Sequence, residues 1–126
     1  MSIAKQYAAL SKSPTLKVGC IMVPNDFSKI ISVGYNGWEK GGTNEPDSLE
    51  EGKSGAIHGE INCMLKVDNR LLYSKCYMYI THSPCKICSR AIVNFGTIVS
   101  VIYNENYRDL SGIEILKKSG ISCIKI

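Results

Sequence analysis

Two short motifs constrain this chain of 126 residues more than any other feature of its sequence. The first places Glu60 two residues after His58, and the second is a Pro-Cys-x-x-Cys run whose thiols are Cys85 and Cys88. Imidazole and thiolate groups are the usual ligands of zinc, and helical Cys-x-x-Cys spacing puts both thiols on one face, about one turn apart. The chain is therefore expected to fold so that both motifs meet around a single zinc ion.

The number of ligands favours a catalytic zinc site over a structural one. Structural zinc is usually closed by four protein ligands, whereas three ligands leave a position for a water molecule, whose pKa the metal lowers towards about 7. Glu60 is close enough to reach that water without binding the metal, so it can pass a proton to a ring nitrogen and later to a departing amine. This chemistry is hydrolytic deamination of an amidine-like base. A structural zinc clip is the alternative, and it would leave Glu60 without a role.

Apolar periodicity and turn residues predict alternating helices and strands. Helices are expected over residues 2–12, 56–67, 85–95 and 111–119, and strands over 16–23, 29–35, 75–81, 97–103 and 121–126. A turn-rich connection joins the first two strands into an antiparallel hairpin, whereas the later strands are separated by helices and should be parallel. The predicted fold is α/β, with helices on both faces of a mixed five-stranded sheet, and residues 1–126 are expected to form one domain.

Residues 36–55 contain several glycines, a proline and several acidic residues without apolar periodicity, so they are predicted to form a long surface loop. Loops of this length are uncommon unless they bind a ligand or move. His58 lies just beyond the loop, near the first turn of the next predicted helix, where the helix dipole favours an anionic group. The loop is therefore a candidate binding or moving element.

Composition limits the class of partner. The net charge of +4 comes from scattered basic residues rather than a basic stripe, which suits a small anionic ligand and argues against nucleic acid. No apolar run approaches the roughly 18 residues that span a bilayer, and the N-terminus lacks a secretory pattern, so a cytoplasmic protein without a membrane partner is expected. Cys20, Cys76 and Cys123 fall in strand-like apolar runs, and these thiols and Cys63 are expected to be reduced and buried.

The H-x-E and P-C-x-x-C pair is the signature of zinc-dependent nucleobase deaminases. Nearly the whole chain resembles the cytidine and deoxycytidylate deaminase superfamily, and within it the deoxycytidylate deaminases. The segments that carry this resemblance are 17–20 (Lys-Val-Gly-Cys), 34–37 (Gly-Tyr-Asn-Gly), 58–62 (His-Gly-Glu-Ile-Asn), 81–88 and 107–109 (Tyr-Arg-Asp). The chain departs from the family at Gly59, where alanine is usual, and at His82, where many relatives have an apolar or acidic residue.

The resemblance implies a cytidine-deaminase-like three-layer fold and the conversion of dCMP to dUMP and ammonia, which supplies the precursor of dTTP. One zinc ion per subunit would be held by His58, Cys85 and Cys88, with Glu60 as the catalytic proton carrier. Regulated members of the family are homohexamers that bind dCTP as activator and dTTP as inhibitor, together with magnesium. Here the loop is shorter than in larger relatives, and the sequence offers no extra histidine for a second zinc ion.

The resemblance and the placement of polar residues also predict ligand contacts. Substrate contacts are expected from Asn36, Asn62, Ser83, Pro84, Tyr107 and Arg108. Effector contacts are expected from Tyr35, Asn36, Gly37, Trp38 and Gly42. Asn36 would otherwise be a turn residue, Asn62 a residue of a helix surface and Arg108 a solvated side chain. Trp38 stacks on a base or caps the core, and His82 is expected to line the pocket or face solvent rather than bind metal.

Two further interpretations of the sequence stay open. The first is a deaminase of another cytosine or adenine substrate, such as a nucleoside, tRNA or single-stranded DNA. The second is a zinc- or nucleotide-binding module without catalytic activity. Metal content and ammonia release from different substrates distinguish them.

Overall fold

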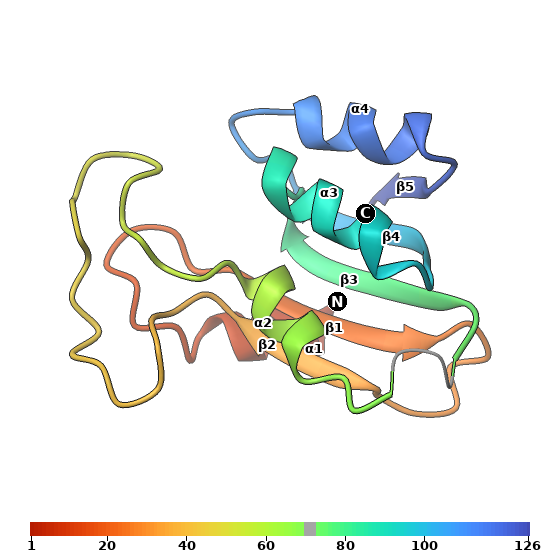
Figure 1. The fold of residues 1–126 in the computed structure, drawn as a ribbon, viewed down its shortest axis with the longest axis horizontal. Coiled ribbons are helices and arrows are strands. Elements are labelled where there is room, and N and C mark those ends of the chain that lie inside the picture. The colour runs from red at the N-terminus through yellow and green to blue at the C-terminus, as the bar shows by residue number, and fades with distance from the viewer. Residues whose placement is uncertain (70–72) are drawn as a thin grey trace.

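The computed structural model describes residues 1–69 and 73–126, which build one sheet and its covering helices (Figure 1). The helices are α1 (Ser2–Ala8), α2 (Gly59–Leu65), α3 (Lys86–Phe95) and α4 (Ser111–Lys118). The strands are β1 (Gly19–Pro24), β2 (Ser32–Tyr35), β3 (Cys76–His82), β4 (Ile98–Glu105) and β5 (Ser122–Lys125). Every predicted element is confirmed in type and order. No helix in the described part of the chain is long and apolar enough to cross a membrane.

The sheet is mixed, with strand order β2-β1-β3-β4-β5. β1 pairs antiparallel with β2, with Gly19 opposite Tyr35, and antiparallel with β3, with Cys20 opposite Ile80. β3, β4 and β5 run parallel to one another. The predicted combination of an antiparallel first hairpin and parallel later strands is therefore confirmed.

The first strand is shorter than predicted because a side chain binds the segment that precedes it. The backbone N–H of Val18 donates to the side-chain oxygen of Asn36 (2.8 Å), and the Asn36 amide donates to the carbonyl of Leu16 (2.8 Å). These bonds satisfy backbone groups that a sheet ladder would otherwise use. The strand therefore begins at Gly19 rather than at Leu16, and residues before it are free to border a cavity.

Helices cover the two faces of the sheet unequally (Figure 1). On one face, α2 packs on β1 and β2, while α3 and α4 pack on each other and on β4 and β5. On the other face, α1 packs on β1, β2 and β3. The predicted three-layer arrangement is confirmed. In the described residues, the second helical layer consists of the short helix α1 alone.

The larger hydrophobic core lies between the sheet and α2, α3 and α4. Met22, Met78, Ile80, Ile92 and Leu116 are among its fully buried side chains. Each such side chain contributes about 1.5–3 kcal/mol by leaving water. This packing fixes α3 directly after β3, so the second cysteine motif begins at the carboxyl end of a central strand.

β2 and α2 approach each other closely at Gly34. A Cβ atom there would lie 2.5 Å from the Cys63 nitrogen and 2.5 Å from the Gly59 oxygen. Both are backbone atoms, so they yield only if the helix that carries Glu60 shifts. We expect Gly34→Ala to lower the free energy of unfolding in urea by about 1–3 kcal/mol. Gly37→Ala is the control, since nothing lies within 4 Å of its Cβ position, and equal losses in both variants would contradict the close approach.

Candidate active site

The two sequence motifs meet as one cluster of metal-binding atoms. His58 Nδ1 lies 3.2 Å from the sulfur of Cys88 and 3.4 Å from the sulfur of Cys85. The three ligand atoms lie within 4.8 Å of one another. A tetrahedral zinc ion separates bound nitrogen and sulfur atoms by about 3.5 Å, given the usual bond lengths. The donor set and its spacing therefore fit zinc.

Two helix starts hold these three residues in place. His58 is the N-cap residue of α2 and makes no side-chain capping bond, so its ring is free to face the thiols. Cys85 is the N-cap residue of α3, and its thiol accepts a hydrogen bond from the backbone N–H of Cys88 (3.5 Å). In α4, Gly112 lies against the carbonyl of Pro84 and leaves no room for a Cβ atom. α4 thus packs directly on the segment that carries the first cysteine ligand.

The cluster distributes its protons unequally. The hydrogen bond between the two thiols lowers the pKa of Cys85 to about 4 and raises the pKa of Cys88. A hydrogen bond with Cys85 also raises the pKa of His58, although burial opposes this shift. Zinc binds the thiolate form of cysteine. Of the two thiols, Cys85 is therefore the one that more readily takes the metal-binding thiolate form.

Glu60 lies in the first turn of α2 and is only 4% exposed. It is outside the group of three ligands, yet it lines the same cavity as His58. Burial raises the pKa of Glu60, because removal from water disfavours the charged carboxylate. A carboxyl group whose pKa is raised holds a proton more readily, which suits a group that must both accept and release one.

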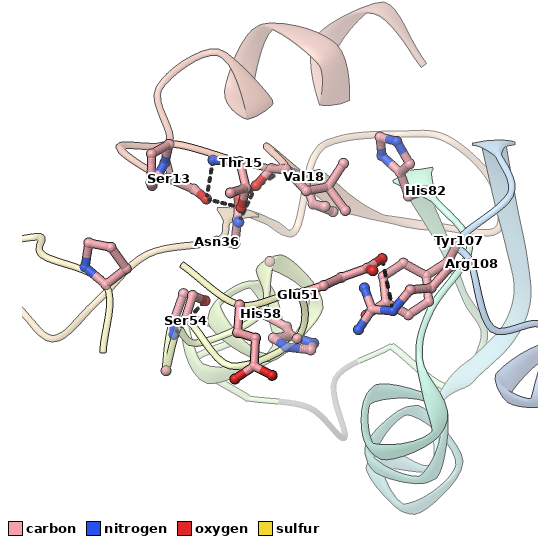
Figure 2. Close-up of a pocket in the computed structure, with 18 of the residues that line it drawn as sticks. Ser13, Thr15, Val18, Asn36, Glu51, Ser54, His58, His82, Tyr107 and Arg108 are labelled. Atoms are coloured by element: carbon pink, nitrogen blue, oxygen red, sulfur yellow. Dashed lines mark hydrogen bonds and ion pairs between the residues drawn. The ribbon is translucent and has the colours of Figure 1, made fainter. Parts of the chain in front are cut away.

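A cavity of about 600 Å³ opens beside the ligand cluster (Figure 2). Its walls come from residues 13–18, from the long loop through residues 46–56, from the start of α2 and from residues 106–108 after β4. Of the predicted substrate contacts, Asn36, Tyr107 and Arg108 line this cavity. Three stretches that are distant in the sequence, residues 13–18, 46–60 and 106–108, therefore enclose one space that includes His58 and Glu60.

The other predicted substrate contacts lie behind the cavity wall. The amide of Asn62 donates to the carbonyl of Tyr35 (2.9 Å), which ties α2 to the end of β2. The hydroxyl of Ser83 accepts a hydrogen bond from the backbone N–H of Tyr107 (2.7 Å), and Ser83 and Pro84 are buried. Neither Asn62 nor Ser83 nor Pro84 is among the residues that line the cavity. In this structure Ser83 positions Tyr107, which does reach the cavity.

Most of the predicted effector residues lie outside the cavity, and Gly37 and Trp38 form the neck of the long loop. Gly37 and Ile57 exchange two backbone hydrogen bonds (3.0 and 2.7 Å), which close the loop and explain why α2 begins later than predicted. The indole N–H of Trp38 donates to the carbonyl of Ser54 (3.1 Å), a contact that strengthens this closure. Of the predicted effector set, Asn36 alone lines the cavity, whereas Tyr35, Gly37, Trp38 and Gly42 do not.

His82 lines the cavity, as expected, and both of its ring nitrogens have partners. Nδ1 lies 3.3 Å from the hydroxyl of Thr81, and Nε2 lies 3.3 Å from a carboxylate oxygen of Glu105. The Thr81 hydroxyl accepts from the backbone N–H of Gly19 (3.1 Å), so its own proton is available to His82. His82 is not part of the metal-binding group.

Two parts of the cavity wall were missed by sequence reasoning. The sequence predicts residues 13–15 as the connection after the first helix and 16–18 as the start of a strand, but residues 13–18 together form an irregular segment along the cavity. Glu51 in the long loop reaches the cavity and pairs with Arg108 (Nε to Oε1, 3.3 Å). No local pattern distinguishes Glu51 from the other acidic residues of the loop, so its partner is visible only in three dimensions.

Comparisons of the sequence with known proteins all indicate the same family. Residues 1–105 match the family described as the cytidine and deoxycytidylate deaminase zinc-binding region. A probable deoxycytidylate deaminase of Drosophila melanogaster is 30% identical over 81% of this chain and 56% of its own length. The deoxycytidylate deaminase of Saccharomyces cerevisiae is 30% identical over 97% of this chain and 42% of its own. The chain thus spans about half the length of these curated relatives.

A solved structure agrees with the sequence comparison. The dCMP deaminase of the cyanophage S-TIM5, in complex with dCMP and dUMP, has a TM-score of 0.85 and 30% identity, covering 99% of this chain and 92% of that one. The family match includes both metal motifs, and the structural match includes the whole sheet. On this evidence, the chain belongs to the cytidine and deoxycytidylate deaminase family.

Proposed function

We propose that this protein catalyses the zinc-dependent hydrolytic deamination of dCMP to dUMP and ammonia. The observation that carries the proposal is the buried Glu60 in one cavity with a cluster of three zinc-binding side chains. The cyanophage relative, whose structure contains dCMP and dUMP, supports this choice of substrate and product. In the reaction, oxygen from water bonds to C4 of cytosine, the C4–N4 bond breaks, and the amine leaves as ammonia.

His58, Cys85 and Cys88 would hold the zinc ion, which supplies the Lewis acidity that makes water nucleophilic near neutral pH. Glu60 accepts a proton from the attacking water and passes it to N3 of the pyrimidine. It then takes the second proton from the hydroxyl group now bonded to C4 and transfers it to the departing amine, which returns Glu60 to its starting state. Its burial keeps bulk water from competing for these protons.

The remaining cavity residues are proposed to bind the nucleotide. Arg108 would pair with the 5′-phosphate, and Tyr107, held by Ser83, would contact the ring or the sugar. The side chain of Asn36 is occupied by the backbone of residues 16 and 18, so it would shape the sugar site chiefly through the segment it holds. Asn62 would act by tying α2 to β2, and Pro84 by setting the start of α3.

Further properties stay predictions that follow from the resemblance. These are activation by dCTP and inhibition by dTTP with magnesium, and assembly into a homohexamer. A single deaminase domain over residues 1–126 is likewise a prediction. A cytoplasmic location is supported by the cysteines, all six of which are free, as is usual in a reducing compartment.

The proposal is tested by zinc analysis and an ammonia-release assay with dCMP, deoxycytidine, dCTP and a cytosine-containing oligonucleotide. We expect one zinc ion per chain and preferential release from dCMP. Preference for another substrate would replace dCMP in the proposal, and zinc binding without release from any of the four would favour a binding module. Adding dCTP or dTTP to the active mixture tests the predicted regulation.

A further inference from the structure

The cavity wall carries more acidic than basic side chains, although the proposed substrate is an anionic nucleotide. Glu50, Glu51 and Glu60 are among its walls, whereas Arg108 is the only lysine or arginine among the described residues that line it. A phosphate group that enters this cavity needs a cation to offset its charge. Arg108 is therefore the group on which phosphate recognition depends, and its present contacts decide how readily it is available.

Three neighbours surround the side chain of Arg108 in the cavity wall, and Figure 2 shows two of them, Tyr107 and Glu51. Its guanidinium lies over the ring of Tyr107, 4.5 Å from the ring centre. Its Nε lies 3.3 Å from a carboxylate oxygen of Glu51. The long loop also passes close by, since a Cβ atom on Gly52 would lie 2.6 Å from a terminal nitrogen of Arg108. The side chain thus bridges the segment after β4 and residues 51–52 of the long loop.

The ion pair between Arg108 and Glu51 is weak enough for another anion to replace Glu51. The side chains of Arg108 and Glu51 are 44% and 74% exposed, so water screens their attraction. By contrast, a phosphate dianion carries more charge than a carboxylate, and the planar guanidinium can bind it through two parallel hydrogen bonds. A phosphate therefore has the advantage over Glu51 for the same cation.

We propose that Glu51 occupies the position of the substrate phosphate on Arg108 in the empty enzyme, and that the 5′-phosphate of an entering nucleotide displaces it. This inference rests on the proposed function and adds a specificity role for Glu51. A nucleoside without phosphate has no group to displace Glu51, so it gains nothing from Arg108. The exchange also releases residues 51–52 of the long loop from Arg108 when a nucleotide binds.

Kinetics of three charge-removing variants test the exchange. For Arg108→Gln we expect the ratio of kcat/KM for dCMP to that for deoxycytidine to fall about 10- to 100-fold, because hydrogen bonds to charged groups are lost. For Glu51→Gln we expect KM for dCMP to fall about 2- to 5-fold, the range of an exposed ion pair, with little change in kcat. Glu45→Gln is the matched control, since Glu45 is exposed on the same loop outside the cavity and should behave as the parent.

A binding measurement on the zinc-loaded protein gives a readout independent of turnover. By calorimetry, we expect Glu51→Gln to bind dUMP more tightly and Arg108→Gln to bind it more weakly, while the two variants differ little in affinity for deoxyuridine. A parent enzyme that releases no ammonia overturns the proposed function, and the dUMP titrations still decide this inference. An unchanged substrate ratio in Arg108→Gln, or weaker dUMP binding in Glu51→Gln, overturns the exchange alone.

Discussion

Replacing Glu60 with glutamine is expected to lower kcat for ammonia release from dCMP by about 100- to 10,000-fold, the usual contribution of a positioned acid–base group. Glutamine has nearly the same shape but cannot carry a proton between water, the ring nitrogen and the leaving amine. Because Glu60 is outside the ligand group, the variant should still bind one zinc ion per chain. Zinc content and kcat are measured on the same preparation, so that loss of metal is separated from loss of proton transfer.

The matched control for this change is Glu114→Gln. Glu114 is an exposed residue on α4, and it is not among the residues that line the cavity. We expect its kcat to equal that of the parent protein. A Glu60→Gln variant that keeps zinc and more than about a tenth of the parent kcat would contradict the role assigned to this carboxylate.

The second large effect is expected from Cys88→Ala. Cys88 is 1% exposed and supplies one of three ligand atoms, so its loss should abolish stable zinc binding and activity together. Zinc should also cease to stabilise the fold. A ligand that binds only the folded state adds about 4 kcal/mol at a thousandfold excess over its dissociation constant. Thermal unfolding with and without added zinc should therefore show a rise in Tm for the parent protein that the variant lacks.

Cys123→Ala is the control variant, because the Cys123 thiol is not expected to bind metal. Cys123 lies in β5, half-buried and outside the ligand group. This variant should retain zinc, activity and the zinc-dependent rise in Tm, apart from the small cost of a lost half-buried sulfur. Zinc-dependent stabilisation of Cys88→Ala equal to that of Cys123→Ala would show that Cys88 is not a ligand.

The metal cluster could be predicted from the sequence because its chemistry depends on residue type and spacing. Cys85 and Cys88 lie one turn apart whenever a helix starts between them, and the proline before them favours such a start. Including His58 in the predicted cluster required one assumption about long-range contacts, namely that two helix starts meet at one edge of the sheet. The fold followed for a similar reason, since alternating strands and helices leave few arrangements of a parallel sheet.

The cavity wall could not be predicted with the same success, because its contacts are side chain to backbone across long separations. Asn36 binds residues 16 and 18, and Asn62 binds the carbonyl of Tyr35, so both amides are used within the protein. A polar residue near a predicted site looks the same in sequence whether it binds substrate or backbone. Glu51 illustrates the converse, because one acid of several in a loop meets Arg108 only after folding.

Gly59 shows how packing can alter the meaning of a departure from a family pattern. Glycine at a helix start costs about 1 kcal/mol relative to alanine on intrinsic propensity. In the structure, a Cβ atom at this position would lie 3.1 Å from the carbonyl oxygen of Val18 and 3.4 Å from the nitrogen of Asn36. The missing side chain therefore lets α2 pack closely on the backbone that Asn36 holds, which offsets part of that cost.

The most direct test of the account is the fate of water oxygen during the reaction. The zinc-loaded protein is incubated with dCMP in water enriched in heavy oxygen, and the nucleotide product is analysed by mass spectrometry while ammonia is measured in parallel. The account predicts dUMP that carries one heavy oxygen atom on its base, together with an equal amount of ammonia. Absence of dUMP, or dUMP without the label, would contradict a hydrolytic deaminase built on His58, Glu60, Cys85 and Cys88.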